Sequence, residues 1–238
     1  MTTLFISDLH LDADRPESTA QFLDFMESEA SQAEALYILG DLFEAWIGDD
    51  DTNSDNALII AALATLKFRG VPCYFMHGNR DFLVGRRFAT ATGCELLTEI
   101  KVVEIAGDRV LLTHGDLLCT DDEPYMALRA AVRDAAWQRE FLAKPAAERR
   151  HIADDLRAKS QAATAAKTEE IMDVNQDAVE TAMRDKEVSI LLHGHTHRPN
   201  VHKFDIDGVE ATRIVLGAWY EQGSVVRWDE NGFELATL

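Results

Sequence analysis

The hydrophobic residues of this chain fall into short apolar runs that stop at a glycine or a polar residue. Runs of this length with such boundaries predict buried β-strands. The segment 18–33 instead carries apolar residues at helical spacing, as at Phe22, Phe25 and Met26, and a further helix is predicted over 57–69, stopped by Gly70. Strands that alternate with helices predict an α/β fold. The apolar runs lie at residues 3–7, 37–39, 73–76, 102–105, 110–113 and 188–192.

Two stretches predict hairpins or strand-rich structure. Residues 102–105 and 110–113 flank a Gly-Asp pair, which is a hairpin signal. Residues 213–238 are rich in strand-forming side chains and contain several glycine turn signals. We expect this final stretch to complete a second sheet.

Some fifty residues in the second half of the chain favour helices and are interrupted at Pro145. We expect them to form a helical insertion, residues 122–170, within a single domain made of the whole chain. Pro124 suits the first turn of a helix, and Asp121 and Asp122 are candidate caps for it. A second helix is predicted directly after Pro145.

The two predicted helices of the insertion differ in their side chains. Trp137 and Phe141 are one helical turn apart, on a face that can be left uncovered by the rest of the protein. On the second helix, cationic and hydroxyl side chains share one face. Ile152 and Leu156 lie on the edge of this face towards the N-terminus, so the helix fits an anionic headgroup with a hydrocarbon tail, although a solvated face explains the charges alone equally well. The face consists of Arg157, Ser160, Thr164 and Lys167.

Length and composition predict a soluble, intracellular globular protein. A chain of 238 residues, of which 47% are hydrophobic, can bury a full core. No apolar stretch reaches the roughly 18 residues of a membrane span, and the N-terminus lacks the features of a signal peptide. The three cysteines are an odd number without paired spacing, which suits free thiols in a reducing compartment.

The net charge of −19 argues against general nucleic-acid binding, which needs a basic surface. It is compatible with a small anionic substrate held by metal ions. The charge is also uneven. Residues 124–167 contain nine Lys or Arg and five Asp or Glu, a net of +4, so the remainder carries −23.

Residues with metal-binding side chains follow the predicted strands. Asp8 and His10 come after the first run, and alternate residues of an extended chain project to the same side. Asp41 follows the next run, where a Gly-Asp pair taken alone is more often a turn or a helix cap. Carboxylate, imidazole and amide ligands without a thiolate suit Mn, Fe, Zn or Co, and seven such residues suit two ions that share a ligand. The seven are Asp8, His10, Asp41, Asn79, His114, His195 and His197.

These residues stand in ordered blocks that resemble the signature of the calcineurin-like metallophosphoesterase family. The blocks are Asp8-Leu9-His10, Gly40-Asp41, Gly78-Asn79, His114-Gly115-Asp116 and Gly194-His195-Thr196-His197. The resemblance implies a four-layer αββα sandwich of two mixed sheets, with the insertion as a helical cap. It also implies one ion on Asp8, His10, Asp41 and His197, and another on Asp41, Asn79, His114 and His195. Asp41 would then bridge two ions that activate a water for attack on phosphorus.

The third block departs from most of that family, in which a histidine follows the Gly-Asn pair and protonates the leaving group. This chain has Arg80 there. Arginine keeps its proton at neutral pH and cannot act as a general acid, but its planar fork suits phosphate. A phosphate leaving group, with a second pKa of about 6, departs without a proton. Arg80 therefore indicates a pyrophosphate substrate; the alternative is an arginine that merely lies at the surface.

Longer blocks narrow the resemblance to the UDP-2,3-diacylglucosamine diphosphatase family of lipid A biosynthesis. They lie at residues 39–50, 77–83, 118–122 and 171–176. The resemblance implies hydrolysis of UDP-2,3-diacylglucosamine to UMP and 2,3-diacylglucosamine 1-phosphate (lipid X), by attack on the α-phosphorus. It implies two divalent ions, most often Mn²⁺, and a cytoplasmic protein held peripherally on the inner membrane. The catalytic residues that it implies are Asp41, Asn79, Arg80 and His195.

Substrate contacts of that family map to Asn79, Arg80, Asp122, Ser160, Lys167 and His195, and position 164, usually Asn there, is Thr164 here. The acidic loop Asp49–Asp51 is predicted to be solvated rather than a second metal site, and Trp46 is either a core residue or a wall of the substrate site. Two alternatives to this function are open. One is another dinuclear phosphodiesterase or phosphatase of the same fold, and the other is a metal-binding scaffold without catalysis.

Overall fold

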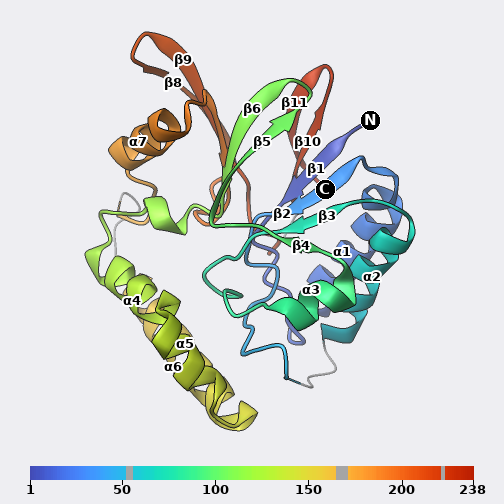
Figure 1. The fold of residues 1–238 in the computed structure, drawn as a ribbon, viewed down its shortest axis with the longest axis vertical. Coiled ribbons are helices and arrows are strands. Elements are labelled where there is room, and N and C mark those ends of the chain that lie inside the picture. Colours follow the sequence, from blue (N-terminus) through green and yellow to red (C-terminus); the bar gives the residue numbers. More distant parts are fainter. Residues whose placement is uncertain (52–55, 165–170, 221–222) are drawn as a thin grey trace.

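Two β-sheets pack face to face, with helices on their outer sides and a helical arm that extends to one side (Figure 1). The structure, a computed structural model, describes residues 1–51, 56–164, 171–220 and 223–238. One sheet has the strand order β11-β10-β1-β2-β3-β4, and the other has the order β5-β6-β7-β9-β8. The predicted α/β architecture of two mixed sheets is confirmed.

The six-stranded sheet carries the strands that precede the first predicted ligands. β1 pairs in parallel with β2, and β2 pairs in parallel with β3, whereas β10 runs antiparallel to β1. The carboxyl ends of β1, β2 and β3 therefore meet at one edge of the sheet. The strands are β1 (Thr3–Ile6), β2 (Ala35–Ile38), β3 (Cys73–Phe75), β4 (Glu95–Leu96), β10 (Ser224–Asp229) and β11 (Gly232–Thr237).

The five-stranded sheet carries the strands that precede the remaining ligands. β5 and β6 form the predicted hairpin, and β6, β7 and β9 are parallel. The expectation for residues 213–238 is wrong in part, because β10 and β11 extend the first sheet and only β9 lies in the second. Strand propensity describes a half-buried surface and does not select the partner strand. The strands are β5 (Ile100–Ile105), β6 (Asp108–Thr113), β7 (Ile190–His193), β8 (Asn200–Ile206) and β9 (Val209–Val215).

Alternate side chains of the central strands separate two cores. In β1, Leu4 and Ile6 pack with the helices, whereas Phe5 packs between the sheets, as the two-residue period of a strand requires. On the other outer side, Val179 and Met183 of α7 (Gln176–Lys186) pack against the five-stranded sheet. The helices on the first side are α1 (Pro16–Ser28), α2 (Ala57–Phe68) and α3 (Arg86–Thr92). The four layers of the family resemblance are therefore present.

The 3₁₀ helices η1 (Ala30–Gln32) and η3 (Asp116–Leu118) also lie between these elements. The first of them shortens the predicted helix 18–33, because the chain turns there to enter β2. The predicted helix 57–69 agrees with α2, which ends at Phe68.

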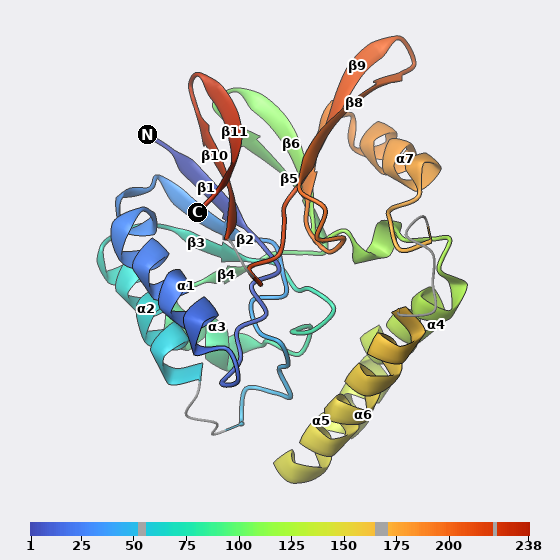
Figure 2. The ribbon, with the colours of Figure 1, turned by 180° about the vertical axis from the view of Figure 1, so that it is seen from behind.

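The helical arm, defined as α4 (Glu123–Arg133), α5 (Ala135–Leu142) and α6 (Ala146–Thr164), stands where an insertion was predicted. Figures 1 and 2 show it projecting from the sandwich beyond η3. Asp122 caps α4 as predicted, because its carboxylate accepts a hydrogen bond from the N–H of Tyr125 at 3.1 Å. The single helix predicted after Pro124 is two helices. Asp134 adopts an extended conformation and its carboxylate caps α5 through the N–H groups of Ala136 and Trp137.

The arm docks on the core through Trp137 and Phe141, so the expectation that their face is left uncovered is wrong. Phe141 is 5% exposed and packs with Ile47 and Leu83, which lie in the loops after β2 and β3. The rings of Trp137 and Phe141 stack with their centroids 4.9 Å apart. The apolar side chains of those loops supply the cover that the helix pattern alone could not reveal.

The acidic loop Asp49–Asp51 has a structural role that the prediction of a solvated loop missed. Asp49 accepts hydrogen bonds from the N–H groups of Gly85 (2.9 Å) and Arg87 (2.8 Å), and so caps α3 from a distant part of the chain. Asp50 and Asp51 form ion pairs with Arg149 and Arg150 of α6. The loop therefore holds both α3 and the tip of the arm.

Arg149→Met is expected to loosen the arm. The guanidinium of Arg149 donates to the buried carbonyl oxygen of Ile47 at 2.7 Å and to the carboxylate of Asp50 at 2.7 and 2.6 Å. Methionine keeps most of the side-chain length but leaves that carbonyl without a donor, which costs about 1–3 kcal/mol. We expect faster hydrogen exchange in α5 and α6 than in wild type. Arg150→Met is the control, because the ion pair of Arg150 is exposed. Equal exchange in the two variants would contradict the anchoring role.

Candidate metal centre

The loops after β1 and β2 are joined by backbone hydrogen bonds. The N–H of Asp8 donates to the carbonyl oxygen of Gly40 at 3.0 Å, and that of His10 donates to Asp41 at 2.9 Å. These bonds continue the parallel pairing past the ends of the strands. As a result, the side chains of Asp8, His10 and Asp41 lie together, each at most 2% exposed.

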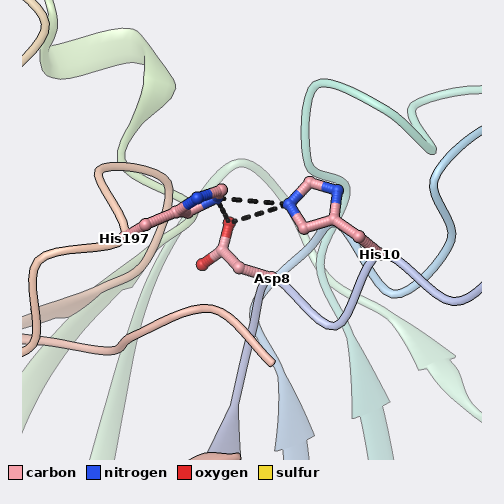
Figure 3. Close-up of side chains that lie close together, drawn as sticks. All are labelled: Asp8, His10 and His197. Carbon is pink, nitrogen blue, oxygen red and sulfur yellow. Dashed lines mark hydrogen bonds and ion pairs between the residues drawn. The ribbon is translucent and has the colours of Figure 1, made fainter. Parts of the chain in front are cut away.

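Asp8, His10 and His197 form the first group of potential ligands (Figure 3). Nε2 of His197 lies 3.3 Å from Oδ1 of Asp8 and 3.2 Å from Nε2 of His10. Oδ1 of Asp8 is buried and accepts no hydrogen bond from the described residues. A carboxylate oxygen that faces two imidazole nitrogens in this way is a donor set that fits a divalent cation.

Asp8, Asp41 and His114 form the second group. Nδ1 of His114 lies 2.8 Å from the carbonyl oxygen of Leu39, which can only accept, so Nδ1 carries the proton. Nε2 is therefore the nitrogen left with a lone pair for a cation. It lies 3.0 Å from Oδ1 of Asn79, which places that amide beside the group.

Asp41 lies between the two groups. Its Oδ2 is 3.8 Å from Nε2 of His10 and 3.7 Å from Nε2 of His114. The ring of His195 lies 5.1 Å from that of His114, centroid to centroid. The fold thus brings all seven predicted ligand residues to one place. Asp8 stands in both groups, a sharing that the sequence did not indicate, while the bridging role of Asp41 stays a prediction.

Five of the predicted ligand residues have a left-handed backbone conformation. This conformation is uncommon outside glycine and costs about 1–3 kcal/mol at a residue that adopts it. The rest of the fold holds these residues in place, so the site is preorganised for a ligand. The φ angles are 57° at Asp8, 49° at His10, 52° at Asp41, 67° at His195 and 57° at His197.

Gly40 is required by close packing at the centre. Its φ is +93°, and a Cβ atom there would lie 2.5 Å from the backbone nitrogen of Gly78 and 2.7 Å from Nδ1 of His114. Gly78 in turn packs directly against the carboxylate of Asp41. The glycines that precede Asp41 and Asn79 therefore allow the two loops to approach each other.

Neighbouring charges set the protonation of the centre. Burial raises the pKa of Asp8, but His197 and the other nearby imidazoles outweigh it and hold that pKa well below its usual range. Burial and His114 lower the pKa of His195 to about 4, so this imidazole is neutral at pH 7. Burial also lowers the pKa of His114, yet Asp41 and Asp8 outweigh that effect and raise it. A cation bound here would therefore compete with a proton at His114, whereas His195 is already neutral.

An open cavity of about 700 Å³ lies over the two groups. Five of the predicted substrate-contact residues line it, namely Asn79, Arg80, Asp122, Ser160 and His195. Arg80 lines the cavity, and its buried Nε has no hydrogen-bond partner among the described residues. The side chain of Thr164 and all of Lys167 lie outside the described residues.

An apolar chamber adjoins this cavity between the arm and the core. Both are lined by Asn79, Arg80 and Ser160, so the chamber opens beside the predicted phosphate-binding groups. Trp46 packs on Phe43 of the core and also lines the chamber, while its role as a wall of the substrate site stays a prediction. Further apolar lining comes from Ile47, Phe82, Leu83, Leu128, Val132, Trp137, Phe141 and Leu156.

Three residues at the centre were missed by sequence reasoning. Tyr220 stacks on His10 with centroids 5.4 Å apart, and Tyr125 lies 5.6 Å from His195. Glu44 approaches Nδ1 of His10 at 3.0 Å. Tyr220 comes from the turn between β9 and β10, far from any motif, and Tyr125 from the first turn of α4. Glu44 lies within the 39–50 block, and its charge beside apolar residues is the sequence feature that could have identified it as a residue of the site.

Asp81 lies behind the centre and is fully buried. Its carboxylate accepts hydrogen bonds from the N–H groups of Leu42 and Gly78, both at 2.8 Å. Burial and the charge of Asp41 raise the pKa of Asp81 to about 7. This carboxyl ties together the two loops that carry Asp41 and Asn79.

Asp81→Asn is expected to destabilise the metal-free protein, and more at pH 5 than at pH 8. An amide nitrogen cannot accept an N–H bond, which costs about 1–3 kcal/mol. Because the folded pKa lies above the unfolded value of about 3.9, wild-type Asp81 contributes stability below pH 4 that is lost as the pH rises through 7. The difference between variant and wild type in urea unfolding should therefore shrink with rising pH. A constant difference would contradict the raised pKa.

Comparison with known proteins identifies the family of the chain and similar proteins within it. Residues 1–199 match the calcineurin-like phosphoesterase family. The chain is 54% identical over 235 residues to proteins named UDP-2,3-diacylglucosamine hydrolase from Klebsiella pneumoniae and Escherichia coli, with 99% of this chain and 98% of each relative covered. Among solved structures it is similar to an archaeal phosphodiesterase, with a TM-score of 0.52, 14% identity and both chains covered in full. At that identity the structural similarity bears on the fold alone.

Proposed function

The chain belongs to the calcineurin-like phosphoesterase family, and from this premise we propose that it hydrolyses the pyrophosphate bond of UDP-2,3-diacylglucosamine. The products are UMP and 2,3-diacylglucosamine 1-phosphate. The observation that carries the proposal is the apolar chamber that opens beside Arg80 and the two ligand groups. A substrate with a pyrophosphate and acyl chains needs both surfaces next to each other. The names of relatives that are 54% identical over nearly the full chain support the same substrate.

We propose that the centre holds two divalent ions, with Mn²⁺ as the native metal. Asp8, His10, Asp41 and His197 would hold one ion, and Asp41, Asn79, His114 and His195 the other. When bound, such a pair lowers the pKa of a water and stabilises charge on the attacking and leaving oxygens. Two observations support this ligand set: Oδ1 of Asp8 is buried without a hydrogen bond from the described residues, and Nε2 of His114 faces Oδ1 of Asn79 at 3.0 Å.

The residues around the ions orient the pyrophosphate. Arg80 lies at the junction of the polar cavity and the apolar chamber, where its guanidinium can form two hydrogen bonds with phosphate oxygens. Asn79 and the neutral His195 complete the polar wall on the side of the second ligand group. These three groups stabilise the charge that develops on the α-phosphoryl group and on the departing sugar phosphate.

The arm would act as a cap, residues 122–170, over the diacylated sugar. Its α4 and α5 helices supply Leu128, Val132 and Trp137 to the chamber, whose apolar wall suits hydrocarbon chains. Asp122 and Ser160 line the polar cavity, and we assign them to the sugar headgroup. Thr164 and Lys167, whose side chains lie outside the described residues, stay predicted substrate contacts.

A lipid substrate also suggests where the enzyme works. In the part of the chain that the structure describes, no helix is long and apolar enough to span a membrane. We propose a peripheral position on the cytoplasmic face of the inner membrane, where an amphiphilic sugar nucleotide partitions. Sedimentation with membranes at low salt, and release at high salt, is the result that this proposal requires.

The purified protein tests the proposed function directly. With Mn²⁺, it should hydrolyse UDP-2,3-diacylglucosamine to UMP, and a chelator should abolish that activity. UDP-glucose and an aryl phosphate are the comparison substrates, because one lacks acyl chains and the other lacks the pyrophosphate. A higher kcat/KM on either of them than on the lipid would overturn the proposal.

A further inference from the structure

One buried carboxylate touches both the metal centre and the helical arm. Oε2 of Glu44 lies 3.0 Å from Nδ1 of His10 and 3.1 Å from Nη2 of Arg15. Oε1 lies 2.9 Å from Nε of Arg157, which belongs to α6. The side chain of Glu44 is 5% exposed, so these interactions are formed away from bulk water.

The contact with His10 fixes which ring nitrogen faces the ligand group. A carboxylate beside Nδ1 keeps the proton on that nitrogen, so Nε2 presents its lone pair. Nε2 is also the nitrogen that lies 3.2 Å from Nε2 of His197 and 3.9 Å from Oδ1 of Asp8. Glu44 therefore orients a potential ligand without occupying a coordination position itself.

The contact with Arg157 fixes the arm. Arg157 lies near the middle of α6, where its Nη1 is also 4.0 Å from Oδ2 of Asp12, so the buried Glu44 is its closer carboxylate partner. Two further ion pairs between α6 and the core lie away from the metal centre. Arg149 and Arg150 bind Asp50 and Asp51, which have no ion pair or hydrogen bond with a predicted metal ligand among the described residues.

We propose that Glu44 is a positioning residue that couples metal binding at His10 to the docking of the arm. A cation on Nε2 of His10 draws electron density from the ring and strengthens the attraction between the Nδ1 side of the ring and the Glu44 carboxylate, 3.0 Å away. That fixes the carboxylate, which then holds Arg157 in one position. Coupling between two sites is reciprocal, so a docked arm must raise the metal affinity by the factor by which metal favours docking.

This inference rests on the metal centre of the proposed function. It adds that an ion at His10 stabilises the apolar chamber, because Leu156 of the same helix lines that chamber. Metal occupancy would thereby prepare the surface for acyl chains as well as the reaction centre.

Mn²⁺ binding to the metal-free full chain tests the coupling without any turnover. In calorimetric titrations, Glu44→Gln should weaken one Mn²⁺ site by about ten-fold or more. Arg157→Gln, although it lies outside the metal centre, should weaken the same site by about five-fold. Arg150→Gln is the matched control on the same helix, and its Mn²⁺ affinity should stay that of wild type.

Hydrogen exchange supplies the reciprocal measurement. Saturating Mn²⁺ should slow amide exchange in α6 of wild type and of Arg150→Gln, and should leave it unchanged in Glu44→Gln and Arg157→Gln. Unaltered Mn²⁺ affinity in Arg157→Gln, or equal protection of α6 in Glu44→Gln and wild type, would overturn the coupling alone. A wild-type chain that binds no Mn²⁺ would overturn the proposed metal centre and the coupling together.

Discussion

Asp41→Asn is expected to reduce hydrolysis of UDP-2,3-diacylglucosamine by about a thousand-fold while the protein stays folded. Oδ2 of Asp41 lies 3.8 and 3.7 Å from the imidazole nitrogens of the two ligand groups. Asparagine keeps the shape but offers one oxygen and no negative charge, so it cannot serve two cations. Losing about 4 kcal/mol of charge stabilisation in the transition state corresponds to that factor.

Asparagine is the informative substitution at this position because the φ of Asp41 is +52°. Asparagine tolerates this conformation, whereas alanine would add backbone strain to the loss of the carboxylate. The N–H of Arg80 donates to Oδ1 of Asp41 at 2.8 Å, and the amide oxygen can accept that bond. The melting temperature should thus stay near that of the exposed control Asp24→Asn. Full turnover by Asp41→Asn with both metals bound would remove Asp41 from the bridging role.

The ligand residues could be predicted from sequence because they directly follow buried strands, whose ends have a defined position in a sheet. Short apolar runs indicate where strands end, and parallel strands place those ends at the same edge of the sheet. Asp8, Asp41 and His114 follow such runs directly, so their proximity needs no knowledge of the rest of the fold. Local signals also located the hairpin, through its Gly-Asp pair, and the α2 helix, through the glycine that stops it.

Contacts between distant segments could not be predicted in this way. Tyr220 reaches His10 only because β9 and β10 lie in different sheets and the chain crosses over the centre between them. Trp137 is covered because the loop residue Leu83 meets α5, and a helical pattern does not name its partner. Glu44 stands in the 39–50 block, but its roles depend on Arg157 more than a hundred residues later. Pairings of this kind depend on packing between elements and not on local spacing.

Arg80→Ala is expected to lower kcat on UDP-2,3-diacylglucosamine by about a hundred-fold or more, in line with the loss of a preorganised donor to developing charge. Arg80 would clamp the departing sugar phosphate, so its removal should matter most when the leaving group is a phosphate. The buried Nε without a partner among the described residues is the donor that this role requires. Arg80→Lys keeps the charge without the planar fork and should recover only part of the rate.

A second substrate distinguishes binding of the departing phosphate by Arg80 from stabilisation of any attacked phosphoryl group. A bis-aryl phosphodiester has a leaving group without a second phosphate, and Arg80→Ala should reduce its hydrolysis by less than about ten-fold, because attack on the phosphorus relies on the ions instead. Equal losses on both substrates would place Arg80 on the attacked phosphoryl group.

The pH profile of Arg80→Ala gives a second measurement. Because an arginine keeps its proton throughout the working range, Arg80→Ala should lower kcat without removing an alkaline limb. Loss of such a limb in the variant would mean that Arg80 governs a proton transfer, contrary to a role as a phosphate clamp.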